Sequence, residues 1–257
     1  MCLILFSLNK HRDYKLVLAA NRDEFFERPT LKSEYWKENP NILGGQDVIS
    51  GGTWLGLTKT GRFIAITNYR DFTLERKNPR SRGEISKKFL LENIDVISFL
   101  TEISSKKHLY NGFNLILSDD QFNTIYHYSN VTDQYQQIEE GFHGLSNHLL
   151  DTPWPKITYG INKLKNFVEN NSNDPTRIYK ILRNEIEADD NNLPDTGISY
   201  DLEKKLSPVF ISMKGYGTRS STVMFVDYEN RVSFYEVTYN EKKEIIGNQA
   251  FDLQLKS

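Results

Sequence analysis

The sequence predicts a layered α+β domain in which helices pack on β-sheets. Short apolar runs of strand length occur near both ends of the chain, and the middle alternates between helical and strand-like spacing. Aromatic residues make up 12% of the chain, which suits β-rich packing. The resulting order, β, then α with β, then α, then β, is typical of helices packed on sheets. Because there is no internal repeat and no convincing linker, we expect residues 1–257 to form a single domain.

Two β-hairpins are expected in the N-terminal part. Apolar runs at 3–6 and 16–20 flank a polar break, and apolar runs at 54–57 and 63–66 flank a short loop that contains Gly61. Two apolar runs joined by a polar or glycine-bearing loop are typical of paired antiparallel strands.

The centre and the C-terminal part add helices and further strands. The spacing of apolar residues predicts helices over 84–92 and 96–103. Further helices are expected to begin at Pro155 and Pro175, because proline is favoured in the first turn of a helix. The remaining expected strands are 113–117, 124–128, 208–212, 221–228 and 232–238.

Composition argues against several classes of function. The chain has 32 basic and 34 acidic side chains, and its net charge of -2 does not indicate nucleic acid or an anionic membrane as a partner. No apolar run approaches the ~20 residues of a membrane-spanning helix, and no secretory signal is recognisable, so we expect a cytoplasmic protein. A single cysteine excludes an intramolecular disulfide, and the scattered histidines lack metal-site spacing. No metal and no cofactor is predicted.

The single cysteine stands directly after the initiator methionine. Methionine aminopeptidases remove methionine before small side chains, so we expect Cys2 to become the first residue of the mature chain. A terminal cysteine carries a thiol and an α-amine, and the neutral amine can accept the thiol proton. One residue then provides both nucleophile and base. The alternative, that Cys2 is a small buried hydrophobe of an apolar strand, stays open at this point.

A polar cluster follows the second expected strand at once. It is the segment Asn21-Arg22-Asp23-Glu24. If the first hairpin forms as predicted, Cys2 and Asn21 lie close together at its open end. Arg22 would then lower the pKa of the thiol by its charge, and Asp23 would accept a hydrogen bond from the α-amine. The alternative is an ordinary polar loop.

Polar side chains also stand at the ends of other expected strands. Asn68 ends the run FIAITN, Asn147 lies in GLSNHLL, and Arg219 precedes an apolar run in GYGTRSSTVMF. Asparagine side chains can donate hydrogen bonds to the oxyanion of a tetrahedral intermediate. The side chain of an asparagine at a strand end also commonly bonds to the backbone of a turn. Each position therefore indicates a catalytic site only in combination with the others.

Several segments together resemble the NRDE family, also called the Transport and Golgi organisation family. The segments, which run from residue 1 to about residue 223, are MC, NRDEFFERP, GGTWLG, NYR, GLSN followed by DTPWPK, and YGTRSSTV. The resemblance implies a relation to the N-terminal nucleophile (Ntn) hydrolases. Their fold is a four-layer αββα sandwich, with two antiparallel sheets between helix layers.

The wider relatives of this family, the choloylglycine hydrolases and penicillin V acylases, use an N-terminal Cys, a nearby Arg and Asp, two Asn and a late Arg. By this resemblance Cys2 is the nucleophile and Asp23 contacts its amine. The relatives place the early Arg farther ahead of the Asp than Arg22 stands here, and Glu24 has no counterpart in their site. The implied catalytic set is Cys2, Arg22, Asp23, Asn68, Asn147 and Arg219.

Two functions follow from this resemblance. The first is a hydrolase with an N-terminal cysteine nucleophile that acts on linear amide bonds. The second is a non-catalytic protein that binds and traffics haem, acyl-CoA or lipid, since eukaryotic members are associated with these ligands. His143 and His148, which flank Asn147, are candidate haem ligands in that case, with polar loop residues as the alternative. A third interpretation, an interaction protein without a pocket, does not explain the polar residues at strand ends.

Overall fold

The computed structural model describes residues 2–71 and 76–256. The chain divides into two compact units, each built on its own antiparallel sheet. Unit 1 contains Met1–Glu27 and Glu140–Asp252, and unit 2 contains Arg28–Glu139 and Leu253–Ser257. Unit 1 is therefore assembled from both ends of the sequence. Two antiparallel sheets with associated helices confirm the α+β class, while the prediction of a single domain stays a prediction.

The sheet of unit 1 joins the N-terminal hairpin to the C-terminal strands. Its strands are β1 (Cys2–Leu8), β2 (Tyr14–Phe25), β10 (Gly141–Leu145), β11 (Ser212–Met213), β12 (Tyr216–Asp227), β13 (Arg231–Tyr239) and β14 (Ile245–Gln254). Their order is β10-β1-β2-β12-β13-β14, with β11 paired to β12. The first predicted hairpin is confirmed, because β1 pairs antiparallel with β2 and places Ile4 opposite Ala20.

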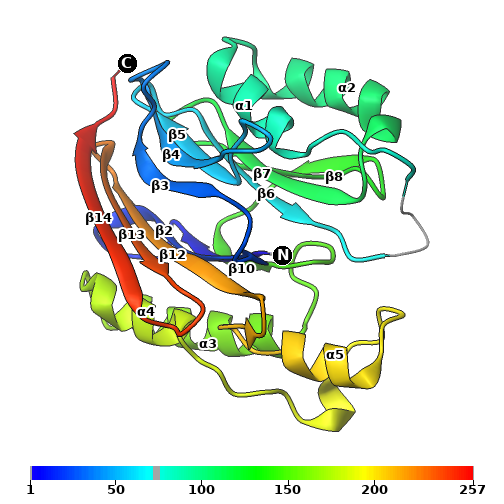
Figure 1. The fold of residues 1–257 in the computed structure, drawn as a ribbon. Coiled ribbons are helices and arrows are strands. Elements are labelled where there is room, and N and C mark those ends of the chain that lie inside the picture. The colour runs from blue at the N-terminus through cyan, green and yellow to red at the C-terminus, as the bar shows by residue number, and fades with distance from the viewer. Residues whose placement is uncertain (1, 72–75, 257) are drawn as a thin grey trace. The chain divides into compact units, whose positions relative to one another are not determined.

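The helices of unit 1 are α3 (Pro155–Glu169), α4 (Pro175–Leu182) and α5 (Tyr200–Leu206). In Figure 1, α3 and α4 run beneath the sheet of this unit. Both predicted proline starts are confirmed, and the Asp174 carboxylate caps α4 by accepting a hydrogen bond of 2.9 Å from the Thr176 N–H. Apolar residues of α3 and α4 pack with the face of the sheet that carries Leu3, Leu5 and Val17.

Two glycines allow α3 to lie close to the sheet. A Cβ atom at Gly160 of α3 would stand 2.4 Å from Leu5 Cδ1, and one at Gly144 of β10 would stand 2.7 Å from Ile157 Cγ2. Either contact would require a neighbouring side chain or the helix to shift, and close packing leaves little room for this. The absence of side chains at these positions therefore allows the close approach of α3 to strands β1 and β10.

The sheet of unit 2 is continuous in sequence order from β3 to β9. Its strands are β3 (Thr30–Tyr35), β4 (Ile42–Asp47), β5 (Leu55–Thr58), β6 (Phe63–Asn68), β7 (Phe113–Ser118), β8 (Tyr126–Ser129) and β9 (Gln134–Gln137). The second predicted hairpin is confirmed by the pairing of Leu55 with Ala65. Gly61 turns the chain between these strands with a φ of 87°, a conformation that favours glycine.

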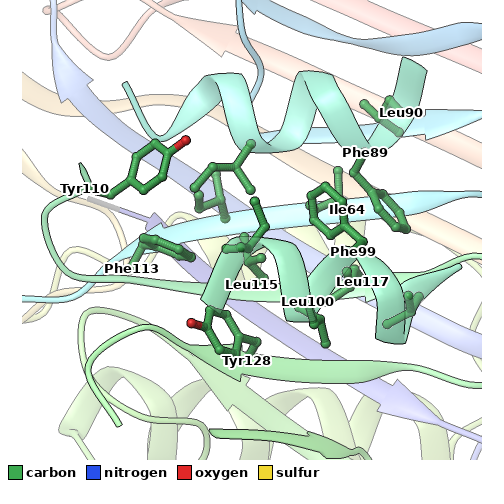
Figure 2. Packing of buried hydrophobic residues seen from close by; sticks show 14 of the residues in the cluster. Ile64, Phe89, Leu90, Phe99, Leu100, Tyr110, Phe113, Leu115, Leu117 and Tyr128 are labelled. Atoms are coloured by element: carbon green, nitrogen blue, oxygen red, sulfur yellow. The ribbon is translucent and has the colours of Figure 1, made fainter. Parts of the chain in front are cut away.

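Helices α1 (Gly83–Leu91) and α2 (Val96–Lys106) confirm the two helices expected in the centre. Figure 2 shows their side chains packed with residues of the unit 2 sheet, among them Phe89 and Phe99 from the helices and Leu115 from β7. Within the described part of the chain, the helices are too short or too polar to cross a membrane.

One expected strand is wrong. Only Ser212 of the segment 208–212 belongs to a strand. The Phe210 N–H donates to the Asn184 carbonyl after α4, and the Val209 carbonyl accepts from the Asn21 side chain. Neither bond is a backbone pairing with a neighbouring strand. The apolar side chains of this segment are buried, as a strand pattern predicts. Of these apolar residues, Ile211 is the one whose backbone is bonded to β12, through Thr218.

Candidate functional site

Cys2 lies at the first position of β1, between β2 and β10. The β1–β2 pairing sets Cys2 opposite Arg22 and Leu3 opposite Asn21, so the predicted open end of the hairpin is confirmed. On the other side of β1, the Ser146 hydroxyl lies 3.1 Å from the Cys2 carbonyl oxygen and donates to it. The neighbours on both sides fix the backbone of the cysteine within the sheet.

Asp23 is buried beside this position and is bonded to β12. The Thr218 hydroxyl donates to Asp23 Oδ1 at 2.7 Å, and the same hydroxyl oxygen accepts from the Ile211 N–H at 2.9 Å. Thr218 and Asp23 face each other in the β2–β12 pairing. A carboxylate with one fixed partner in the sheet has a defined orientation, as an amine-binding group requires.

Asn21 connects the hairpin to two distant segments. Its side-chain NH₂ donates to the Leu182 and Val209 carbonyls, both at 2.9 Å, and its Oδ1 accepts from the Ser221 hydroxyl at 2.6 Å. The Asn21 amide therefore satisfies the carbonyl at the end of α4 and one in the loop before β11. The first residue of the NRDE motif has a structural role in this protein.

Arg219 lies at an irregularity of β12. The register against β2 shifts between Thr218 and Ser220, which leaves Arg219 as an extra residue, and its Nη1 donates to the Phe25 carbonyl at 2.8 Å. Burial lowers the pKa of Arg219, and the positive charge of Arg22 lowers it further. The two predicted arginines therefore lie near each other in unit 1. Bulges re-aim side chains and are frequent next to active sites.

Asn147 follows β10 and is fully buried. The β1–β10 pairing places Leu145 opposite Ile4, so the same register carried two residues on brings Asn147 level with Cys2. The Ser146 hydroxyl lies 3.2 Å from Asn147 Oδ1, which directs the amide NH₂ away from that hydroxyl. Asn68, by contrast, ends β6 in unit 2, where it is paired with Phe113. Its part in the site stays a prediction.

The charge of Arg22 lowers the thiol pKa, as expected, but the net shift is upward. Although Cys2 as a residue keeps partial exposure, burial of the thiol raises its pKa, and the Asp23 charge raises it further. The charge of the amino terminus, then Arg22 and the backbone N–H of Asp23, favour the thiolate, but these effects are smaller than the loss of hydration. An uncharged thiol is therefore the favoured form.

The pKa of the Asp23 carboxyl is likewise set by burial and by nearby positive charges that act in opposite directions. Burial raises its pKa, while the positive charges of the amino terminus, Lys156 and Arg22 and the Thr218 hydrogen bond act in the opposite direction. Lys156, in the first turn of α3, is itself buried. Thr218, Lys156 and Ser146 are not among the predicted site residues. All three stand in quoted family motifs, but no local pattern indicates that they approach Asp23 or Cys2.

The raised thiol pKa predicts slow alkylation. At pH 7, Cys2 in the chain that retains Met1 should react with iodoacetamide more slowly than glutathione, because a smaller fraction is thiolate. Its rate should still increase at pH values where the rate of glutathione has levelled off. Mass spectrometry of the labelled protein across a pH series measures this. If the pH–rate curve of Cys2 has its midpoint at or below that of glutathione, burial does not determine the thiol pKa.

The two candidate haem ligands each lie within hydrogen-bond distance of a neighbouring side chain near the end of β10. His143 Nδ1 lies 2.8 Å from the Asp151 carboxylate, and His148 Nδ1 lies 2.9 Å from the Thr152 hydroxyl. Burial lowers the pKa of His148. Among residues 2–71 and 76–256, no group of three or more His, Cys, Asp or Glu side chains is arranged to hold a metal ion.

Solved structures of other proteins have a similar fold. A mutant of the conjugated bile acid hydrolase from Clostridium perfringens aligns with a TM-score of 0.54 and 11% identity, covering 100% of this chain and 94% of the other. The Caenorhabditis elegans ortholog of N-acylethanolamine-hydrolyzing acid amidase aligns with a TM-score of 0.51 and 13% identity, covering 87% and 92%. At such identities the likeness concerns the fold, which is of the Ntn-hydrolase type.

The family follows from sequence comparison. The profile described as Transport and Golgi organisation 2 matches residues 1–241. The Transport and Golgi organization protein 2 homolog of Bos taurus is 36% identical over 259 residues, which cover 92% of each chain. The chain belongs to the Transport and Golgi organisation 2 family, as its motifs indicate.

Proposed function

We propose that this protein is a hydrolase with an N-terminal cysteine nucleophile that cleaves linear amide bonds. One observation carries the proposal: the only cysteine begins β1, and a buried carboxylate, Asp23, lies at the adjoining end of β2. A buried acid is unfavourable unless a positive or hydrogen-bonding partner balances it. The α-amine of a mature Cys2 provides such a partner, and the same amine is the base that the thiol needs.

The proposed reaction starts from the neutral thiol. The Cys2 sulfur attacks the amide carbon while the α-amine takes the thiol proton, and the carbonyl oxygen becomes an oxyanion. Asn68 or Asn147 is the proposed donor to that oxyanion. The intermediate then collapses, the C–N bond breaks, and the leaving amine takes the proton from the α-ammonium. Water then gives a proton to the same amine and attacks the thioester carbon, the C–S bond breaks, and the sulfur takes the proton back from the α-ammonium. The carboxylic acid leaves and the thiol is free again.

The raised thiol pKa is compatible with this sequence of steps. A preformed thiolate is not required, since the α-amine accepts the proton during attack. The two similar structures belong to proteins named a conjugated bile acid hydrolase and an N-acylethanolamine-hydrolyzing acid amidase. Both names describe hydrolases, and the second names an amidase, which supports the proposed reaction class.

The proposal requires that Met1 be removed. We expect the protein isolated from cells with methionine aminopeptidase to begin at Cys2, because a small second side chain permits cleavage. Intact-mass measurement of the native protein decides this. Complete retention of Met1 in active protein would contradict the mechanism, because the base would then belong to another residue.

A substrate screen distinguishes the hydrolase from a binding protein. Mature protein is incubated with N-acyl amines and N-acyl amino acids, and release of the amine is measured. The same preparation is titrated with haemin and with an acyl-CoA. Amine release supports the hydrolase. Tight binding of haemin or acyl-CoA without cleavage of any amide would favour the trafficking function instead.

A further inference from the structure

A row of polar side chains crosses four strands of unit 1, beginning at Cys2. The pairings place Cys2 opposite Arg22, and Arg22 opposite Ser220 of β12. Ser220 is in turn opposite Thr238 of β13. Paired residues of neighbouring antiparallel strands point to the same face of a sheet. We call these four residues the polar row.

The polar row lies on the sheet face opposite to the helices of unit 1. Leu3 and Leu5 of β1 belong to the apolar cluster with α3 and α4, and side chains alternate along a strand, so Cys2 points to the other face. The next row on that face begins with Ile4, opposite Ala20, and continues through Thr222 to Glu236. The polar row therefore differs from its neighbour in carrying the thiol and a guanidinium group.

Two hydroxyls of the polar row are buried without a partner in the part of the chain that the structure describes. They are Ser220 Oγ and Thr238 Oγ1, and Ser220 is only 5% exposed. Buried hydroxyls are ordinarily hydrogen-bonded, because losing hydration without a replacement is unfavourable. Both hydroxyls are donors that an acceptor group of a ligand would satisfy. Their position in one row with the nucleophile points to a substrate group.

The charged side chains near the polar row indicate which kind of ligand group would accept from these hydroxyls. Arg22 adjoins Ser220 and favours a negatively charged group, and hydroxyls donate well to a carboxylate. Glu236, in the next row, accepts from the Thr222 hydroxyl at 3.4 Å and opposes a negative charge beyond Thr238. A carboxylate is therefore best placed over Ser220, between Arg22 and Thr238.

The strand spacing gives the length of the substrate. Neighbouring strands lie about 4.8 Å apart, so Ser220, two strands from Cys2, is about 10 Å away across the sheet. The row ends beside Gly247 of β14, where an added Cβ would stand 3.4 Å from Thr238 Oγ1. The glycine leaves the space beside that hydroxyl without a side chain.

We propose that Ser220 and Thr238, together with Arg22, bind a carboxylate of the substrate about 10 Å from the carbon that Cys2 attacks. This inference rests on the proposed function and specifies its substrate class: linear amides that carry a carboxylate several bonds from the amide.

Alkylation of Cys2 tests the binding site without requiring turnover. The probe is N-iodoacetyl-6-aminohexanoate, whose carboxylate reaches about 10 Å from the reactive carbon, and its neutral carboxamide is the reference. We expect the acid to label wild-type Cys2 faster than the carboxamide. In Ser220→Ala this preference should fall about tenfold, because a hydrogen bond to a charged group is lost. Thr238→Val should reduce it in the same direction.

Two controls test whether a change in preference comes from the carboxylate site rather than from the loss of any buried hydroxyl or from a change in the reactivity of Cys2. Ser7→Ala removes another buried hydroxyl that lacks a partner among the described residues, but Ser7 is opposite Val17 and lies on the helix-covered face. It should leave the preference unchanged. The short pair iodoacetate and iodoacetamide cannot reach Ser220, so its rate ratio should be the same in wild type and Ser220→Ala.

The outcomes distinguish this inference from the proposed function. Equal labelling of wild-type Cys2 by the long acid and its carboxamide would overturn the carboxylate site, and so would an unchanged preference in Ser220→Ala. A preference that depends on Ser220 supports the site even if no amide is cleaved. In that case the hydrolase fails and the site belongs to a binding protein. Cleavage of neutral amides alone, with no preference, would leave the hydrolase and remove the carboxylate site.

Discussion

Replacing Cys2 with serine should lower amide turnover by roughly a thousandfold or more, as loss of a catalytic nucleophile does in other hydrolases. Serine has almost the same size and fits the same position in β1, so packing is preserved. Its hydroxyl has a far higher pKa than a thiol, and the α-amine is too weak a base to activate it well. The measurement is the rate of amine release by the mature variant on the best substrate from the screen.

A control for this variant lies in the NRDE motif. Glu24 is partly exposed and stands 4.0 Å from Arg22 across a weak ion pair, and no role in catalysis is predicted for it. Glu24→Gln should keep turnover within a few-fold of wild type. Thermal unfolding of both variants should match wild type within a few degrees. Turnover above a tenth of wild type in Cys2→Ser, on enzyme that begins at residue 2, would exclude Cys2 as the nucleophile.

Replacing Asn21 with alanine should lower the free energy of unfolding by about 3–5 kcal/mol. The Asn21 amide donates to the carbonyls of Leu182 and Val209 and accepts from Ser221. Alanine leaves two buried carbonyls and one buried hydroxyl without these bonds, in a region where water does not replace them. The loss is large because each unsatisfied buried group adds its own desolvation cost.

Urea unfolding of the full chain measures this loss, and a variant at an exposed asparagine provides the comparison. Asn170 is exposed and donates from its side chain to the Asn166 carbonyl at 2.6 Å. Asn170→Ala should cost less than about 0.5 kcal/mol, since water replaces the lost bond. A cost for Asn21→Ala as small as that of Asn170→Ala would show that the buried bonds of Asn21 contribute little to stability.

The sequence alone predicts the parts of the fold that depend on neighbouring residues. The hairpin that brings Cys2 to Arg22 is readable because two apolar runs flank a polar break. The prolines that start α3 and α4 are equally local signals. By contrast β14 has no apolar run, and its residues are exposed or half-buried along its whole length. An edge strand of this kind is stabilised by its pairing, which local patterns do not indicate.

The family motifs name most residues of the candidate site, but they do not predict which residues those side chains contact. Cys2, Arg22 and Asp23 are near each other because they share one hairpin. Thr218 reaches Asp23 only because β12, almost two hundred residues later, pairs with β2. The irregularity at Arg219 then shifts the register by one residue and sets Ser220 opposite Arg22. Long-range pairing of this kind depends on the whole sheet, so spacing along the sequence does not predict it.

What the sequence by itself determined is the identity of the chemical groups: one cysteine behind Met1, an acid in the NRDE motif, and asparagines and arginines at strand ends. Only the tertiary structure decided how the thiol and the acid titrate and to which sheet face each side chain points. The charge of Arg22 predicts a lowered thiol pKa, whereas the folded protein raises it. The reason is physical: a neighbouring charge can be inferred from local sequence, but desolvation depends on every atom that surrounds the sulfur, and most of those atoms come from distant segments.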